Sequence, residues 1–317
     1  MKKERLVLLD RYVKLLKAGD VVAFPTETVY GLGANAKNPD AIQKVFEIKG
    51  RPSDNPLIVH ISDKRQVEDF ALEISEDAHK LMDAFWPGPL TLIFKKKPEV
   101  LDIITAGLDT VALRWPKHPL SQELIAMAGP VVAPSANSSG KPSPTKAEHV
   151  KEDFGDDFPV VDAGETEIGL ESTVLDITSI PYTIYRPGAV SADEIERVTG
   201  KEVSLDSSTS KNKTAKSPGT KYSHYSPEAE VRWISSGDTT IVDEALYLLH
   251  SRPAPRKSER VIHYDGVFNK MAHELYDRFR HADHQQLEYV FVEPFSNEQL
   301  QEPIVQALKN RISKAIG

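Results

Sequence analysis

The chain has 317 residues, of which 40% are hydrophobic and 27% are charged, so it is long enough for about two globular domains with a sizeable core. It contains no cysteine, which excludes disulfides, thiolate metal sites and cysteine nucleophiles and fits a reducing compartment. The formal net charge of −8 lacks the bulk basicity of a dedicated nucleic-acid-binding protein. Charged residues interrupt the apolar positions near the N-terminus, so we expect no signal peptide, no membrane contact and a cytoplasmic location.

An amphipathic helix over residues 6–17 is predicted first, because apolar residues recur at helical spacing before Gly19. The buried strand Val21–Phe24 follows and must end at Pro25, which has no N–H for a sheet ladder. Hydroxyls, a carboxylate, a phenol and two glycines then crowd into residues 26–33. Backbone that leaves a strand of an α/β domain is where ligands usually bind. This stretch is therefore the first candidate site, although a Thr-capped strand-to-helix turn has the same composition.

A second helix is predicted over Pro39–Lys49, with Asn38 as its N-cap and Gly50 as its stop. Lys49 and Arg51 leave its last turn in a loop that two prolines stiffen. These cations could simply complement the helix dipole. A proline-stiffened loop is, however, a costly way to hold two surface charges, so we favour an anion site.

Two later strands deliver arginines to their ends. The predicted strand 111–113 is followed by Arg114, and the predicted strand 182–185 by Arg186, each just before or beside a proline turn. A helix over Pro119–Ala128 lies between them. Two strand-end arginines, added to the Lys49–Arg51 pair, indicate positive charge gathered at one edge of a sheet.

Two further segments carry polar groups whose role the sequence leaves open. Strand 57–61 is apolar except for His60, and a lone histidine on a strand is more often a packed residue than a ligand. The loop 134–142 follows a buried strand and contains Ser135 and Asn137. Such a loop could be a solvent-exposed connection, because serine, asparagine, glycine and proline are general turn residues.

The chain divides into two predicted α/β domains. Residues 1–200 close with a helix that starts in a Ser191–Glu194 capping box and stops at Gly200. Residues 201–227 have no hydrophobic periodicity and are predicted to be a linker, and 228–317 form a smaller domain with parallel strand pairing. In it we predict strands at Val231–Ile234, Val261–Tyr264 and Tyr289–Val292, and helices at Asp243–Leu249, Lys270–Phe279 and Pro303–Ala315.

The cations and the serine, threonine and asparagine donors together predict a site for a nucleoside triphosphate. No G-x-x-x-x-G-K-[ST] segment is present, which excludes a P-loop, and Gly31-Leu32-Gly33 alone is too short for a dinucleotide fingerprint. ATP bound here must therefore be held mainly by side chains. On these features alone the chain is a phosphate-handling α/β enzyme.

Several motifs resemble those of the YrdC-type threonylcarbamoyl-AMP synthases. They are Pro25–Ala34, the Lys49 and Arg51 pair, Ser135 with Asn137, Glu171–Val174 and Tyr185–Gly188. The linker with His224–Pro227 and the second α/β domain resemble the long, two-domain form of that family. The resemblance implies an N-terminal YrdC-like domain with a twisted open sheet and a smaller Rossmann-like α/β domain after it.

The resemblance also implies a nucleotidyltransferase that converts L-threonine, bicarbonate or CO2, and ATP with Mg2+ into threonylcarbamoyl-AMP and pyrophosphate. The product would pass to the machinery that transfers the threonylcarbamoyl group to adenosine beside the anticodon of tRNA, with weak RNA contact at most. By position, Lys49 and Arg51 would be catalytic, and no resident metal site is implied. The implied ATP ligands are Lys49, Arg51, Asn55, Ser135, Asn137, Thr145, Arg186 and Tyr225. The implied threonine ligands are Thr28, Tyr30, His60, Arg114 and Ser172.

The chemistry of the reaction agrees with these residue types. The threonine carboxylate suits Arg114, and its hydroxyl needs a polar partner such as Thr28 or His60. Attack of a carbamate oxygen on the α-phosphate spreads negative charge that cations and magnesium can stabilise. The amine must be neutral to capture CO2, and the sequence does not name its base. Segment 217–227, with two prolines, two tyrosines and a histidine, is predicted to be a lid over the nucleotide, with a stiff spacer as the alternative.

Three other interpretations stay open. A non-catalytic RNA-binding module would use the same cations as phosphate contacts, although the acidic balance argues against it. A carbamoyl-phosphate-using relative of the hydrogenase-maturation type normally carries cysteine zinc modules, which a chain without cysteine lacks. The C-terminal domain could also hold a separate activity, for which no motif is present.

Overall fold

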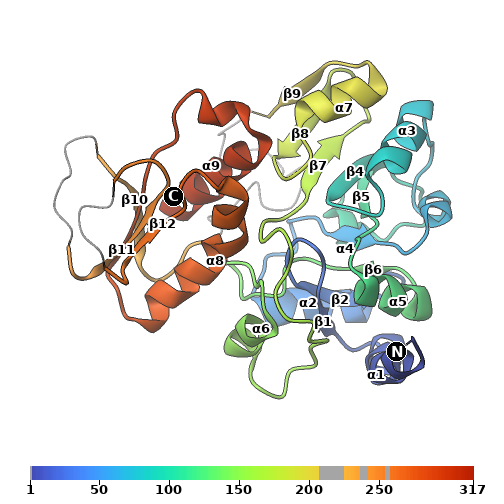
Figure 1. Cartoon of the computed structure of the whole chain (residues 1–317). Helices are drawn as coiled ribbons and strands as arrows, with labels where there is room; N and C mark the ends of the chain where they lie inside the picture. The colour runs from blue at the N-terminus through green and yellow to red at the C-terminus, as the bar shows by residue number, and fades with distance from the viewer. Residues whose placement is uncertain (1, 207–224, 236–241, 254–257) are drawn as a thin grey trace.

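The structure of the chain is a computed structural model that describes residues 2–206, 225–235, 242–253 and 258–317. Two β-sheets organise it (Figure 1). The larger has nine strands in the order β1-β2-β6-β3-β5-β4-β7-β8-β9, and the smaller has four in the order β10-β13-β11-β12. The predicted fold class, a twisted sheet domain followed by a smaller α/β domain, is confirmed.

The larger sheet is mixed, because β3/β5, β4/β7 and β8/β9 pair in parallel and the other neighbours are antiparallel. Its apolar core consists of a large cluster between the sheet and helices that include α2 and α3, a second cluster beneath α1 and α5, and a small cluster around Ile58 and Val174. The strands are β1 Val22–Phe24, β2 Gly31–Asn35, β3 Ile58–His60, β4 Leu90–Lys95, β5 Thr110–Arg114, β6 Val131–Val132, β7 Thr173–Asp176, β8 Tyr182–Arg186 and β9 Val203–Leu205.

Helices α2 and α7 begin and end at the residues that local signals indicate. Asn38 accepts hydrogen bonds from the N–H groups of Asp40 and Ala41 at the start of α2, and Gly50 ends that helix with φ 58°. The capping box of Ser191 and Glu194 is present at the start of α7. The helices are α1 Lys2–Lys17, α2 Pro39–Lys49, α3 Glu76–Phe85, α4 Asp102–Thr105, α5 Pro119–Ala128, α6 Ala147–Phe154 and α7 Ala192–Thr199, with a 3₁₀ helix η1 over Lys64–Asp69.

The smaller sheet is entirely parallel, as predicted, and is covered by two long helices. The prediction of a helix over 243–249 is wrong, because Ala245–Leu249 forms β11, an interior strand with all five residues buried. A short apolar run buried on both faces of a sheet has no periodicity that distinguishes it from a buried helix. The elements are β10 Glu230–Trp233, β11 Ala245–Leu249, β12 Val261–His263, α8 Phe268–His284, β13 Tyr289–Val292, the 3₁₀ helix η2 Gln299–Gln301 and α9 Pro303–Ile316.

The larger sheet continues past residue 200, where we predicted the first domain to end. Strand β9 pairs in parallel with β8, so its residues belong to the sheet rather than to a connection without structure. The proposed boundaries at 200 and 227 otherwise stay predictions. Residues 207–224, which include His224 and most of the predicted lid, lie outside the described residues.

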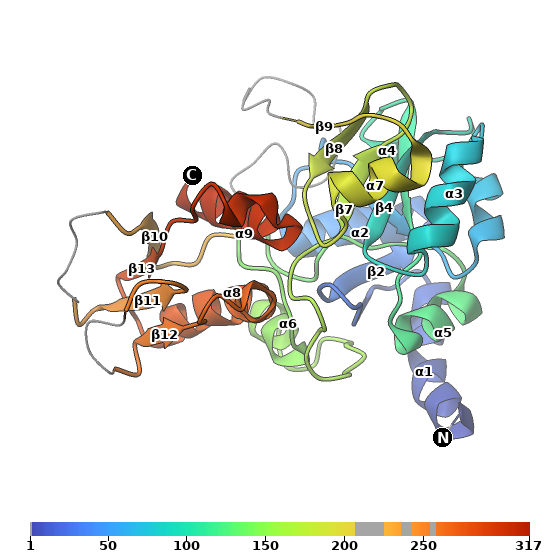
Figure 2. The ribbon, with the colours of Figure 1, turned by 45° about the horizontal axis from the view of Figure 1, so that its top comes forward.

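Helices α8 and α9 lie between the smaller sheet and the rest of the molecule in both views (Figures 1 and 2). Val29 and Leu170, which precede β2 and β7, belong to the same apolar core as Leu275 of α8 and Leu308 of α9. Gly169 has φ +83°, and a Cβ there would lie 2.5 Å from the Cα of His273 in α8. Glycine at this position therefore permits the close approach of α8.

The carboxyl edge of the smaller sheet is where an anion would bind in many α/β domains. Here the Glu293 carboxylate, just after β13, accepts hydrogen bonds from the successive N–H groups of His250 at 2.7 Å, Ser251 at 2.9 Å and Arg252 at 3.1 Å. The carboxylate of Glu293 thus occupies the N–H groups that an anionic ligand would otherwise use. Among the described residues no helix has the length and apolar character needed to cross a membrane.

Candidate active site

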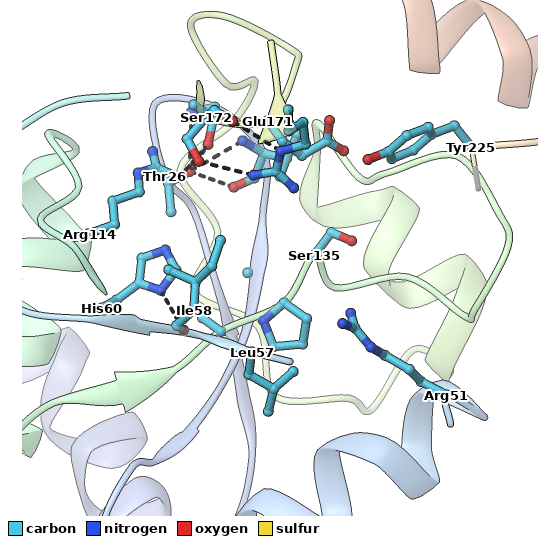
Figure 3. A pocket seen from close by; sticks show the side chains of 16 residues that line it. Thr26, Arg51, Leu57, Ile58, His60, Arg114, Ser135, Glu171, Ser172 and Tyr225 are labelled. Atoms are coloured by element: carbon cyan, nitrogen blue, oxygen red, sulfur yellow. Dashed lines mark hydrogen bonds between the residues drawn. The ribbon is translucent and has the colours of Figure 1, made fainter. Parts of the chain in front are cut away.

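A pocket lies at the strand ends of the larger sheet and gathers most of the predicted site residues (Figure 3). In this view Arg114 and His60 lie at one end and Arg51 and Tyr225 at the other, with Ser135 between them. The predicted residues that line it are Thr28, Arg51, His60, Arg114, Ser135, Ser172, Arg186 and Tyr225. Thr26 and Glu171 line it as well, and neither was predicted as a ligand.

Arg114, at the end of β5, is buried and held in a fixed orientation. Its Nη2 donates to Oε1 of Glu27 at 2.7 Å, its Nη1 to Oγ1 of Thr28 at 3.0 Å, and its Nε to the carbonyl of Gly88 at 3.3 Å. Glu27 is in turn fixed by the N–H of Lys117, 2.9 Å from Oε2. A guanidinium has five N–H groups, so Arg114 keeps donors for a ligand carboxylate. The sequence placed Glu27 in the candidate stretch but gave no sign of its partner.

The hydroxyl network at Thr26 determines what Thr28 can offer. Thr26 Oγ1 lies 2.7 Å from the carbonyl of Val29, to which it must donate its one hydrogen. The hydroxyl of Thr28, 2.8 Å from Thr26 Oγ1, must then donate to Thr26. Thr28 therefore faces the pocket as an acceptor, suited to an N–H or O–H group of a ligand.

His60, the last residue of β3, is buried at the same end of the pocket. Burial, together with the cation of Arg114, lowers the pKa of His60 to about 3, so the ring is neutral at physiological pH. Its Nδ1 lies 3.3 Å from the carbonyl of Ile58, to which a neutral ring donates. The other nitrogen, Nε2, is then left as an acceptor.

This pKa predicts how stability depends on acidity. The pKa of His60 is lower in the folded than in the unfolded chain. The contribution of the neutral His60 ring to the free energy of unfolding is therefore complete above about pH 6.5 and is lost as the pH falls toward 3. At pH 5 the free energy of unfolding is about 2 kcal/mol lower than at neutral pH because of this one residue. We expect the free energy of unfolding to fall between pH 7.5 and pH 5 by about that much less in His60→Gln than in wild type. Chemical denaturation at both pH values measures this.

The matched control is His79→Gln, which replaces an exposed histidine of α3. It should keep the pH dependence of wild type. An equal fall in all three proteins would show that His60 titrates in the folded protein as it does in the unfolded one.

Arg186, the last residue of β8, donates two hydrogen bonds from its guanidinium to Ser172. Its Nε donates to the carbonyl of Ser172 and its Nη2 to the hydroxyl, each at 3.0 Å. The hydroxyl of Ser172 also lies 2.8 Å from Thr91 Oγ1. Tyr225 lines the pocket nearby with φ 69°, a left-handed conformation unusual for tyrosine. Ser172 and Arg186, which their hydrogen bonds hold in place, form one corner of the pocket, here called the Ser172–Arg186 corner.

Lys49 lies behind the pocket and does not belong to its lining. Its Nζ donates to the backbone carbonyls of Ser135 and Asn137. Burial, and then the nearby Arg51, lowers the pKa of Lys49 well below its usual value. Lys49 therefore fixes the loop that carries Ser135, and its predicted contact with phosphate stays a prediction.

Asn55 and Asn137, both predicted to bind ATP, do not belong to the lining of the pocket, but they carry buried polar atoms without a partner among the described residues. Asn55 is fully buried, and neither the oxygen nor the nitrogen of its amide has a hydrogen-bond partner among the described residues. The amide oxygen of Asn137 has none either, although its nitrogen donates to the carbonyls of Ser138 and Lys141. A buried polar group without a partner costs about 1–3 kcal/mol. Such groups next to Arg51, which donates to the Asn55 carbonyl at 3.2 Å, favour a bound polar molecule here.

Thr145 and Tyr30 are buried outside the pocket lining. The N–H of Thr145 donates to Nδ1 of His149 at 3.2 Å. The hydroxyl of Tyr30 donates to the carbonyl of Gly164 at 2.8 Å and accepts from the N–H of Ala163 at 3.1 Å. Their predicted contacts with ATP and threonine stay predictions.

Glu171 belongs to a motif that the sequence singled out, but its role in the pocket was not predicted. Its carboxylate accepts from Arg311 Nε at 2.7 Å, Ser143 Oγ at 2.6 Å and the Tyr276 hydroxyl at 3.0 Å. Burial alone would raise the pKa of Glu171, but the cations of Arg311 and Arg186 outweigh it and hold the pKa at about 2. Arg311 and Tyr276 come from α9 and α8, so the C-terminal helices reach the edge of the pocket. No local signal connects residues that are 140 positions apart.

A pocket of strand-end arginines and hydroxyls, without a glycine-rich phosphate loop, defines an α/β protein that binds an anionic ligand through side chains. A model of the Sua5_yciO_yrdC family, described as telomere recombination, matches residues 14–188. A second model, described as the C-terminal domain of threonylcarbamoyl-AMP synthase, matches residues 190–317. The chain therefore belongs to the Sua5_yciO_yrdC family, in its two-domain form.

Relatives with curated names agree with this membership. The chain is 42% identical to the threonylcarbamoyl-AMP synthase of Pyrococcus abyssi (strain GE5 / Orsay), over 95% of this chain and 92% of the relative. It is 44% identical to the threonylcarbamoyl-AMP synthase of Bacillus subtilis (strain 168), over 96% and 91%. It also matches the crystal structure of P. abyssi Sua5 complexed with L-threonine, with a TM-score of 0.88 and 40% identity over 98% of this chain and 94% of that one. The predicted family and fold are confirmed.

Proposed function

We propose that the chain is a threonylcarbamoyl-AMP synthase, a nucleotidyltransferase that makes threonylcarbamoyl-AMP and pyrophosphate from L-threonine, bicarbonate or CO2, and ATP. The observation that carries the proposal is the pocket itself, with a neutral acceptor end at His60 and Thr28 beside Arg114, and a second cationic end at Arg51. Relatives of this chain at 42% and 44% identity bear that enzyme's name.

The Arg114 end suits the functional groups of threonine. The remaining N–H groups of Arg114 can pair with the amino acid's carboxylate. The two acceptors, Thr28 Oγ1 and His60 Nε2, can receive its hydroxyl and amine hydrogens. Burial and Arg114 lower the pKa of His60, and Arg311 and Arg186 lower that of Glu171, so neither is favoured as the base that deprotonates the ammonium group.

The Arg51 end suits the nucleotide. We propose that Arg51, Ser135, Arg186 and Tyr225 contact ATP directly, while Lys49 orients the Ser135 loop. The nitrogen of the neutral amine forms a bond to the carbon of CO2, one C–O π bond becomes the negative charge of the carboxylate, and a proton passes from the nitrogen to water, which leaves the carbamate. A carbamate oxygen then forms a bond to the α-phosphorus. The bond between the α-phosphorus and the oxygen that bridges it to the β-phosphate breaks, and pyrophosphate leaves with that electron pair. The arginines stabilise the negative charge that spreads over the phosphoryl oxygens.

Mg2+ would enter this site together with the nucleotide. Within the described residues no cluster of three His, Cys, Asp or Glu side chains could hold a metal ion. Magnesium is commonly bound by substrate phosphates with few protein ligands. We propose that it enters on the ATP phosphates, where it would neutralise part of their charge.

We further propose a cytoplasmic location and transfer of the product to the tRNA threonylcarbamoyl-transfer machinery. A mixed anhydride of a carbamate and AMP is an activated acyl donor that water destroys, so a following enzyme must use it promptly. The net charge of −8 supports no more than weak contact with RNA.

The test is an omission experiment with ATP, Mg2+ and bicarbonate. Pyrophosphate release should require threonine, and threonylcarbamoyl-AMP should form in equal amount, as measured by chromatography with mass detection. An RNA-binding module would release no pyrophosphate under any of these conditions. Turnover of ATP that continues unchanged without threonine would contradict the proposal.

Substrate analogues test the threonine end of the pocket. 2-Aminobutyrate lacks the hydroxyl, so it would leave buried acceptors unpaired, and we expect its kcat/KM to be at least about 100-fold below that of threonine. Serine keeps the hydroxyl and loses only a methyl group, which typically costs about 10–200-fold. Equal efficiency for threonine and 2-aminobutyrate would exclude Thr28 and His60 as partners of the hydroxyl.

A further inference from the structure

Two buried arginines of the C-terminal helices reach into the loops that carry the pocket. Arg311 of α9 is fully buried and Arg280 of α8 is 5% exposed. Neither lines the pocket, and each donates to both a carboxylate and a backbone carbonyl on the opposite side of the domain contact. They contact different ends of the site.

Arg311 holds together the two segments that form the Ser172–Arg186 corner. Its Nε donates to the Glu171 carboxylate at 2.7 Å, its Nη2 to the Glu171 carbonyl at 3.3 Å and its Nη1 to the Pro187 carbonyl at 2.9 Å. Glu171 immediately precedes Ser172, and Pro187 immediately follows Arg186. Arg311 therefore fixes the backbone on both sides of the Arg186–Ser172 hydrogen bonds.

Arg280 holds the loop that follows Asn137. Its two terminal nitrogens form a fork with the carboxylate of Asp153, each at 3.0 Å, and Nη2 also donates to the carbonyl of Pro142 at 2.7 Å. The Asp153 side chain is fully buried, and its Oδ2 accepts the N–H of Ser138 at 2.9 Å. Ser138 directly follows Asn137, whose carbonyl accepts from Lys49. The arginine thus reaches the nucleotide loop directly at Pro142 and also through the carboxylate of Asp153.

We propose that Arg311 and Arg280 are positioning residues for different parts of the pocket. Arg311 fixes the Ser172–Arg186 corner and so affects threonine as well as ATP, whereas Arg280 fixes the Asn137 loop and affects ATP alone. The proposal rests on the function proposed above. Buried ion pairs add little net stability, and apolar residues would dock the domain as well. What a planar, multiply bonded guanidinium adds is fixed geometry.

The experiment compares Arg311→Met with Arg280→Met, because methionine keeps an apolar stem without the charge. Threonine affinity is measured by calorimetry without ATP, and the KM for ATP at saturating threonine. We expect Arg311→Met to raise the Kd for threonine at least about 10-fold while Arg280→Met changes it less than about twofold. Arg280→Met should instead raise the KM for ATP at least about 10-fold.

Each single variant leaves a carboxylate buried without its cation and can fail to fold. The paired variants Glu171→Gln with Arg311→Met and Asp153→Asn with Arg280→Met remove that charge, and they should show the same division between the substrates. His273→Gln is the control. Among the described residues the His273 ring contacts Glu165 at 3.1 Å and the Glu167 carbonyl at 3.2 Å, and neither of these lines the pocket. It should leave both constants within about twofold of wild type.

A merely structural role would loosen the domain contact, so that both variants would move both constants together. Equal effects of the two arginine variants on both substrates, or no effect of either, would therefore overturn the proposal. A wild-type protein that forms no threonylcarbamoyl-AMP overturns the proposed function itself and, with it, the assignment of the two substrates.

Discussion

Replacement of Lys49 by methionine should lower threonine-dependent pyrophosphate release by about 100-fold or more. Lys49 is the common donor to the carbonyls of Ser135 and Asn137, so its loss releases the loop that we propose contacts the phosphates. It also removes any positive charge that the amine gains when a nucleotide binds. The measurement is the initial rate at saturating ATP and threonine, with thermal melting followed by circular dichroism to confirm the fold.

The matched control is Lys44→Met on the same helix, which removes a half-exposed ion pair with Asp20. Exposed pairs contribute about 0–1 kcal/mol to stability, so this variant should behave as wild type. A folded Lys49→Met protein with a rate close to wild type would show that neither the loop anchor nor the charge matters for the reaction.

Arg114→Met should lower kcat/KM for threonine by about 100- to 1,000-fold, because the amino acid's carboxylate would lose its cation in a buried pocket. The substitution also leaves the carboxylate of Glu27, now without its 2.7 Å partner, buried at the site. That should destabilise the fold by about 3–5 kcal/mol. Steady-state kinetics with varied threonine and a denaturation curve measure the two effects.

The two effects can be separated by adding Glu27→Gln to Arg114→Met. The double variant removes the unpaired charge and should recover stability, but it should not recover threonine turnover. Arg65→Met, which removes an exposed pair with Asp63, is the control for loss of an arginine alone. Recovery of turnover in the double variant would mean that Arg114 supports Glu27 rather than the substrate.

Features with a local cause were predictable from the sequence. Asparagine before proline starts α2 and glycine stops it, because the first residue satisfies free N–H groups and the second adopts a left-handed φ. The helix over Pro119–Ala128 was predicted with its observed bounds. Arginines at the ends of β5 and β8 meet in one pocket because strand ends share an edge of the sheet, and that edge is where ligands bind.

Features that depend on contacts distant in sequence were not predictable. The apolar run of β11 looks the same as a buried turn of helix until its neighbours β12 and β13 are known. Glu27 gave no sign of its pairing with Arg114, 87 positions away, and Glu171 none of its pairing with Arg311. Lys49 was recognised as a cation near the site, but its two carbonyl acceptors become visible only when β6 is placed beside β2 and β3.

The pairing of Glu171 with Arg311 has a consequence for the newly made protein. A ribosome adds about 5–20 residues per second, so the 140 positions between them correspond to roughly 7–28 s of synthesis. During that time the larger sheet can form around β7 and β8, while the Glu171 carboxylate has no cation from α9 and must stay hydrated. If the first domain folds in this interval, its Ser172–Arg186 corner lacks the contacts of Arg311, and the active site is complete only when α9 arrives.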